Sequence, residues 1–172
     1  MKPILPVHLN FAQKAKTGFE IHGIWPINKL NRLSESLLTN EGDIEAELRF
    51  DRAGPIPFID GHITAELDLK CQRCMQSVKY PIDTHFKMGM VQNDAQLEKL
   101  PDEYEPYLIE EENNHLPDML EDELLLAMPL VAMHDFDCSD YLNQQETEQE
   151  EKVEDPKSEK KDNPFAVLKD LL

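Results

Sequence analysis

DIEAELRF, residues 43–50, alternates apolar and polar side chains with the two-residue period of a β-strand. The apolar side chains share one face of this strand: Ile44, Ala46, Leu48 and Phe50. Glu45, Glu47 and Arg49 share the other face. The pattern therefore predicts a strand with one face in the core and the other in water.

Two further stretches continue the pattern after the turn residues DRAGP (51–55). We expect a second strand from about Ile56 to Cys71, and Asp60-Gly61 predicts a β-bulge within it. We expect a third strand over about 78–90, in which Pro81 favours the edge of the sheet. Alternating strands joined by short turns predict an antiparallel meander with one buried face.

Segments on both sides of the meander are expected to pack with it. GFEIHGIW (18–25) alternates as a strand, and the leucine spacing after Pro26 predicts a helix over about 26–38. LPDMLEDELLLAMP (116–129) predicts a helix over about 117–128. LVAMHDFDC (130–138) is expected to be a short buried strand. The fold class is α+β: an antiparallel, partly closed meander covered by two or three helices.

The composition changes after residue 142. Residues 143–163 are polar and highly charged, which predicts a disordered acidic linker. NPFAVLKDLL (163–172) has a capping Asn, then Pro, then apolar residues at helical spacing. It predicts a short helix at 164–172, which must dock because so short a helix is marginal alone. Residues 1–142 are expected to form a single α+β domain.

The 172-residue chain carries a net charge of −18, unevenly distributed. Residues 101–142 contain thirteen Asp and Glu but no Lys or Arg. Such a segment repels phosphate and attracts basic partners, of which ribosomal proteins are one class. The alternative is that the acidic residues only keep the protein soluble.

Several classes of protein are disfavoured by the sequence. No apolar stretch is long enough to predict a membrane span, and MKPILPVHLNF (1–11) lacks the apolar run of a signal peptide. Three cysteines are few for a disulfide scaffold and favour a cytoplasmic location. The sequence has neither a Gly-x-Ser-x-Gly nucleophile motif nor a glycine-rich phosphate loop, so we expect no enzyme activity.

CQRC contains the candidate site. Cys71 is in phase with the apolar face and should end the second strand, whereas Cys74 should lie in the turn. Two thiolates at such a turn suit a zinc knuckle, and a tetrahedral zinc needs two more ligands. His134 and Cys138, four residues apart, are the candidates. A redox-active dithiol and two unliganded thiols packed in a turn are the alternatives.

Four stretches stand out in this order along the chain: LDLKCQRCMQSV (67–78), LPDEYEPYLIEE (100–111), EDELLLAMPLVAMHD (121–135) and NPFAVL (163–168). Together they resemble the bacterial YceD family, the large ribosomal RNA subunit accumulation proteins. The resemblance implies a cytoplasmic, non-catalytic protein that supports synthesis, processing or stability of 23S rRNA. Other branches of the family have a cysteine-rich second motif where this chain has HDFDC (134–138).

These observations together predict an accessory factor in large-subunit biogenesis that binds a basic ribosomal protein or assembly factor. The acidic segment would speed association, and the terminal helix would be an apolar anchor. The expected contact residues are Arg73, Phe165, Leu168 and Leu171. One alternative is a structural zinc-binding module. The other is direct rRNA binding through basic residues, namely Lys2, Lys14, Lys16, Lys29, Arg32 and Arg73.

Overall fold

The computed structural model describes residues 2–109 and 113–139. The chain divides into two compact units, Met1–His134 and Asp135–Leu172, and the fold below is that of the first. The predicted linker at 143–163 and the predicted helix at 164–172 lie outside the described residues. The predicted domain boundary at 142 stays a prediction.

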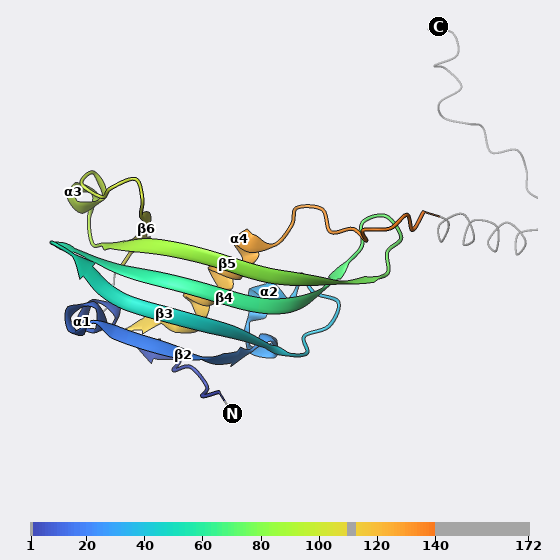
Figure 1. The fold of residues 1–172 in the computed structure, drawn as a ribbon, viewed down its shortest axis with the longest axis horizontal. Helices are drawn as coiled ribbons and strands as arrows, with labels where there is room; N and C mark the ends of the chain where they lie inside the picture. The colour runs from blue at the N-terminus through green and yellow to red at the C-terminus, as the bar shows by residue number, and fades with distance from the viewer. Residues whose placement is uncertain (1, 110–112, 140–172) are drawn as a thin grey trace, which may run out of the picture. The chain divides into compact units, whose positions relative to one another are not determined.

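The stretch at 43–50 lies in β3, an inner strand of a five-stranded sheet (Figure 1). In spatial order the strands are β2 (Phe19–Pro26), β3 (Asp43–Ala53), β4 (Ile56–Lys70), β5 (Ser77–Val91) and β6 (Glu105–Leu108). Strands β2 to β5 are antiparallel, and β6 runs parallel to β5. The α+β class and the meander are confirmed. The sheet is open rather than partly closed, because β2 and β6 lie at its two ends and do not pair with each other.

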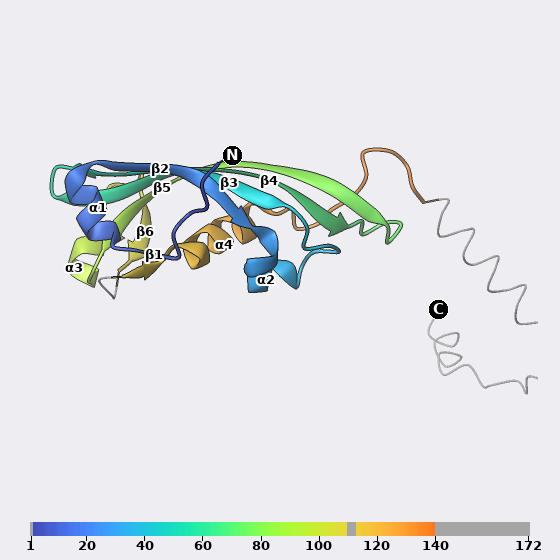
Figure 2. The same cartoon turned by 90° about the horizontal axis from the view of Figure 1, so that it is seen from below.

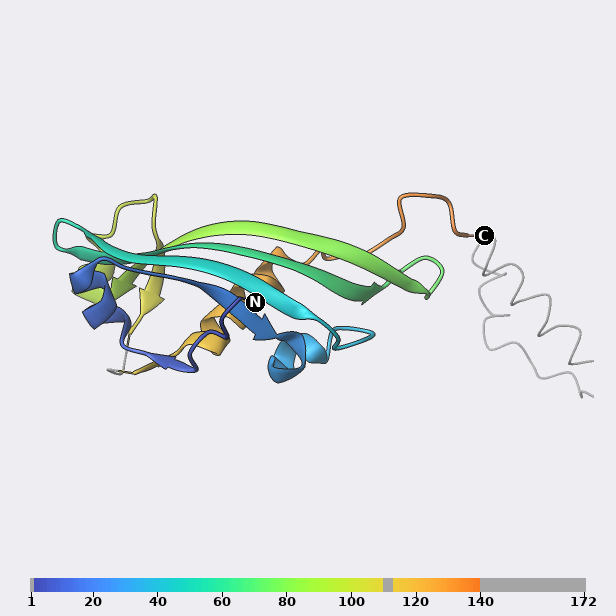
Figure 3. The ribbon, with the colours of Figure 1, turned by 60° about the horizontal axis from the view of Figure 1, so that its bottom comes forward.

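Helices cover the apolar face of this sheet, as Figures 2 and 3 show for α1, α2 and α4. The helices are α1 (Phe11–Thr17), the 3-10 turn η1 (Ile27–Lys29), α2 (Asn31–Ser34), α3 (Asp94–Leu97) and α4 (Leu116–Ala127). A separate two-stranded pair joins β1 (His8–Leu9) to β7 (Asn114–His115). Among the described residues, no helix has the length and apolar character needed to cross a membrane.

The helix predicted over 117–128 is confirmed as α4, but the helix predicted over 26–38 is too long. Leu30 has extended backbone angles (φ −99°, ψ 93°), which separate η1 from α2 and end helical geometry there. Leu30 is 1% exposed, so burial of this side chain outweighs the helical pattern of the sequence. Helix α1 was not predicted; Asn10 caps it by accepting a hydrogen bond from the N–H of Gln13 at 2.8 Å.

The predicted bulge at Asp60-Gly61 is wrong. The register is continuous there, with Asp60 opposite Lys87 and Gly61 opposite Phe86. A Cβ atom at Gly61 would lie 2.1 Å from Cζ of Phe86. The glycine therefore makes room for an aromatic ring on a regular strand instead of marking a break in it.

The predicted edge position of Pro81 is confirmed. In the described residues, β6 pairs only with Met88–Val91, so β5 has β4 as its single neighbour beside Pro81. A proline, which has no N–H to donate, fits this unpaired side of the strand.

The buried strand predicted over 130–138 is wrong. No strand forms in this segment, and Leu130 and Val131 are 103% and 56% exposed. A short apolar run without a clear hydrophobic period does not predict whether its side chains are buried or exposed.

Candidate metal centre

The β4–β5 turn holds the Cys-x-x-Cys pair as predicted. Cys71 directly follows the last residue of β4, and Cys74 lies inside the turn. The N–H of Cys71 donates to the carbonyl of Gln76 at 2.8 Å, and the N–H of Met75 donates to the carbonyl of Cys71 at 2.9 Å. Met75 adopts a left-handed conformation (φ 63°), which lets the chain reverse within so few residues.

His134 approaches this turn from a segment 60 positions further along the chain. Its Nδ1 lies 3.4 Å from Sγ of Cys74, and its Nε2 lies 3.0 Å from the carbonyl oxygen of Ser77. Because a carbonyl can only accept, Nε2 carries a proton, and Nδ1 is the ring nitrogen that faces the sulfur of Cys74. This hydrogen bond orients the ring in the way that partners of metal-bound histidines do.

The donor atoms of Cys71, Cys74 and His134 all lie within 4.8 Å of one another. Two ligands of one tetrahedral zinc, with bonds of about 2.0–2.3 Å, are separated by roughly 3.5 Å. The 3.4 Å distance between Cys74 Sγ and His134 Nδ1 agrees with that separation. Cys71 and Cys74 are 0% and 2% exposed, so the sulfur atoms are shielded from bulk water. Three of the four predicted ligands are therefore together.

Cys138, the fourth predicted ligand, belongs to the second unit, which begins at Asp135. Its role stays a prediction.

Backbone groups of the turn stabilise a thiolate at Cys71. Burial alone would raise the pKa of this thiol, but hydrogen bonds from the backbone of Cys74, Arg73 and His134 outweigh it. Together with the Cys74 side chain they lower the pKa of Cys71 to about 5. The site thus favours the deprotonated form in which cysteine binds metals.

Arg73, a predicted partner contact, lies in the same turn. Its Nη2 atom is 3.8 Å from Sδ of Met133. The three other predicted contact residues, Phe165, Leu168 and Leu171, lie outside the described residues. All four stay predictions as partner-binding residues.

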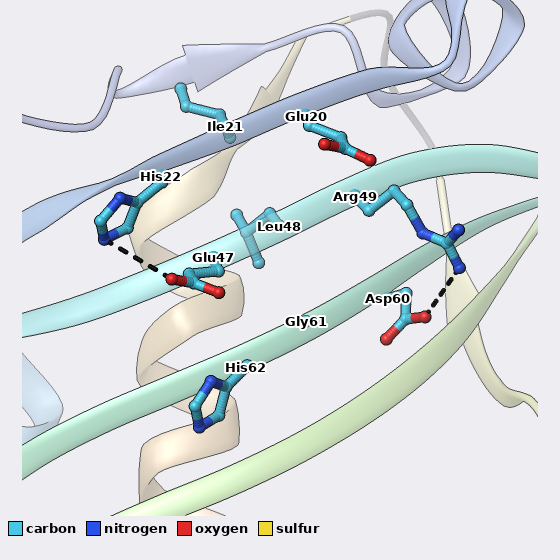
Figure 4. A pocket seen from close by; sticks show the side chains of 9 residues that line it. All are labelled: Glu20, Ile21, His22, Glu47, Leu48, Arg49, Asp60, Gly61 and His62. Atoms are coloured by element: carbon cyan, nitrogen blue, oxygen red, sulfur yellow. Dashed lines mark hydrogen bonds and ion pairs between the residues drawn. The ribbon is translucent and has the colours of Figure 1, made fainter.

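The sequence did not predict a second group of side chains, which lies on the polar face of the sheet, opposite helices α1, α2 and α4. The register places His22 beside Glu47, Glu47 beside His62, and His62 beside His85. Figure 4 shows His22, Glu47 and His62 lining a shallow cavity of about 540 Å³. The rings of His62 and His85 stack at 3.9 Å, and Asp83 lies 2.8 Å from His62. These histidines are far apart in sequence, so only the strand register reveals that they form a row.

Comparison with known proteins agrees with the resemblance in the sequence. The family model described as "Large ribosomal RNA subunit accumulation protein YceD" matches residues 59–172, a range that includes all three cysteines. A protein of the same name from Haemophilus influenzae is 34% identical over 170 residues, covering 97% of this chain and 95% of its own length. No solved structure matches. The chain therefore belongs to the YceD family of large ribosomal RNA subunit accumulation proteins.

Proposed function

We propose that this chain is a non-catalytic, cytoplasmic accessory factor that supports synthesis, processing or stability of 23S rRNA. We also propose that it acts by binding a basic ribosomal protein or large-subunit assembly factor. The name of the family and of its Haemophilus influenzae relative supports the role in rRNA accumulation. The proposal of a basic partner rests on the charge of segment 101–142, which has thirteen carboxylates and no Lys or Arg.

Local ion pairs weaken the alternative of direct rRNA binding through the basic N-terminal residues. Arg32 donates to Glu121 at 2.9 Å and to Asp122 at 2.6 Å. Hydrogen bonds to Asp122 and then Glu121 raise the pKa of this guanidinium. Lys2 forms an ion pair with Glu45. Two of the five predicted N-terminal cations are thus neutralised within the fold, which leaves less positive charge for phosphate.

The basic lining of one cavity favours direct rRNA binding as the second candidate function. Lys16, Arg52 and Lys99 line a cavity of about 340 Å³ together with aliphatic side chains. In the part of the chain that the structure describes, none of these three cations forms an ion pair. If the protein contacts rRNA directly, this is the surface on which we expect the phosphates to lie.

A binding panel separates the two candidates. The full chain is titrated by biolayer interferometry against purified large-subunit ribosomal proteins, one at a time, and against 23S rRNA fragments. We expect binding to at least one basic protein, weakened about tenfold or more when salt rises from about 50 to 300 mM. Binding to rRNA alone, lost in the variant Lys16→Glu with Lys99→Glu, would instead establish the RNA candidate.

We further propose that zinc is bound by Cys71, Cys74, His134 and Cys138 as a structural ion. The convergence of three of these ligands and the orientation of the His134 ring support this proposal. The test is zinc content by mass spectrometry after purification without chelators. We expect about one zinc per chain, lost in Cys74→Ser and retained in the matched histidine control His85→Asn.

Replacing Cys138 tests the fourth position by itself. Cys138→Ala should weaken zinc affinity by roughly a hundredfold or more, because three protein ligands hold a structural zinc poorly. Unchanged affinity in Cys138→Ala would remove this residue from the ligand set. Absence of zinc in the purified wild-type chain, together with no uptake of added zinc, would leave two unliganded thiols as the correct interpretation.

A further inference from the structure

Four large apolar side chains are exposed at and after the C-terminal end of α4. Leu126, Leu130, Val131 and Met133 are 76%, 103%, 56% and 44% exposed. We call these four residues the apolar patch. Single exposed leucines are ordinary on protein surfaces, but several within eight consecutive residues are typical of an interaction site.

The backbone holds the apolar patch in place. The carbonyl of Ala132 accepts a hydrogen bond from the N–H of Gln72 at 2.8 Å, which ties the segment to the cysteine turn. Ala132 is 7% exposed, whereas its neighbours Val131 and Met133 face outward. In Figure 1 the segment after α4, in orange, runs toward the end of the sheet that carries the β4–β5 turn. The exposure of these side chains is therefore set by the fold, and a partner would meet a preformed surface.

The charges beside the apolar patch indicate which partner it suits. Asp118, Asp122 and Leu126 follow each other at four-residue spacing and form one exposed stripe of α4. The side chains of Asp118 and Asp122 are 64% and 51% exposed, although Asp118 also contacts His115 at 2.8 Å and Asp122 pairs with Arg32 at 2.6 Å. Helix α4 contains no Lys or Arg. The helix side of the apolar patch is thus bordered by carboxylates, with Arg73 as a cation on the side of the turn.

We infer that the apolar patch is the docking site for a basic partner, a protein segment that presents aliphatic or aromatic side chains flanked by Lys or Arg. The inference rests on the proposed function and locates it on the surface. The apolar side chains of the partner pack on Leu126 and Leu130, and its cations face the carboxylates of α4. Apolar contacts at the centre supply most of the affinity, whereas charge at the rim supplies rate and selectivity.

The first test uses the ribosomal proteins that bind the wild-type chain. The double variant Leu126→Ser with Leu130→Ser should lose about tenfold or more in affinity for these proteins. The matched control is Leu97→Ser with Leu108→Ser, two leucines that are 44% and 54% exposed elsewhere on the chain. The control should stay within about threefold of wild type. Equal losses in both double variants would overturn the inference while leaving the proposed function intact.

A second test keeps the inference separate from the proposed function. The probe is a synthetic peptide of leucines and lysines, compared with a peptide in which serine replaces leucine. If no ribosomal protein binds the wild-type chain, the proposed partner class fails. The inference still stands if the leucine–lysine peptide binds and loses about tenfold in affinity with Leu126→Ser and Leu130→Ser but not with the control. Equal binding of this peptide to all variants would overturn it.

Two further experiments show whether a different occupant covers the apolar patch. If Phe165→Ser with Leu168→Ser raises affinity for the peptide, the C-terminal segment of the chain itself occupies the apolar patch, and the inference is wrong. If sedimentation shows a wild-type dimer that dissociates in the Leu126→Ser, Leu130→Ser variant, a second copy occupies it, and the inference is again wrong.

Discussion

The apolar face of the sheet and the β4–β5 turn at its end are both buried, but different atoms bury them. The face is covered by many aliphatic and aromatic side chains, of which Phe50, Ile63 and Leu120 are examples with 0% exposure. The turn is held by a few specific groups, among them the sulfur atoms of Cys71 and Cys74. Burial on the face is shared among many residues, whereas the turn is closed by a few backbone hydrogen bonds and by contacts between specific atoms.

This difference predicts different effects of substitutions in the two regions. A packed face loses free energy in proportion to the atoms removed and the cavity left behind. The zinc proposed for the turn predicts that the turn loses its order almost completely when one ligand is removed, while the face stays intact. Four substitutions or treatments test this contrast.

The largest effect on global stability is expected from Phe50→Ala. The Phe50 ring lies 5.3 Å from that of Phe11 and 6.3 Å from that of Phe19, so its removal leaves a cavity between β3 and α1. The free energy of unfolding, measured by urea denaturation, should fall by about 3–5 kcal/mol. The exposed control Leu97→Ala should change it by less than about 0.5 kcal/mol. Similar losses for both would mean that the sheet face is not the main source of stability.

The next effect is expected from Gly61→Ala. The new methyl group would overlap the ring of Phe86, at 2.1 Å from Cζ. We expect a loss of about 1–3 kcal/mol, again measured by urea denaturation. Adding Phe86→Leu makes room for the methyl group, so the double variant should be more stable than the sum of the two single losses predicts. Simple additivity would show that the ring does not set the requirement for glycine.

A smaller, pH-dependent effect is expected at Glu123, which is 6% exposed on α4. Burial, then the charges of Glu105 and Asp122, raise the pKa of Glu123 to about 7. The folded state therefore holds this proton more tightly than the unfolded chain, whose ordinary carboxyl pKa is about 4.3. Stability from this group is complete below pH of about 4.3 and is lost as pH rises through about 7.

The variant Glu123→Gln removes this titration. It should be about 1–2 kcal/mol more stable than wild type at pH of about 8, and the difference should vanish at pH of about 4. Glu98→Gln, at an exposed position directly after α3, is the matched control. A Glu123→Gln advantage that persists unchanged at low pH would contradict an electrostatic origin.

Chelating the proposed zinc is expected to have the smallest effect on the stability of the core. It should also show the largest difference between the two regions. Hydrogen exchange should rise about tenfold or more in residues 71–77 and 130–134, because these segments meet at the cysteine turn. The core transition followed by far-UV circular dichroism should shift by less than about 1 kcal/mol, since the turn lies beyond the ends of β4 and β5. Loss of the whole fold on chelation would show that the two regions are not independent.

Local sequence patterns predicted the structure correctly where neighbouring residues along the chain determine the conformation. The alternation at 43–50 predicted β3, the stretch 116–129 predicted α4, and strand phase placed Cys71 and Cys74 correctly. It failed where packing across the molecule overrides the local pattern, as at Leu30, whose burial interrupts a helical run. The short helix α1 also escaped it, because one helical turn or two carry little periodic signal.

The sequence by itself determined the meander, the position of the cysteine pair and the family, since each of these rests on patterns within short stretches of the chain. Only the tertiary structure decided that His134 Nδ1 faces Cys74, that Gly61 lies beneath the Phe86 ring, and that Leu130 is exposed. The physical reason is that period and spacing act over a few residues. Strand register and contacts between segments 60 positions apart depend on how the whole unit packs.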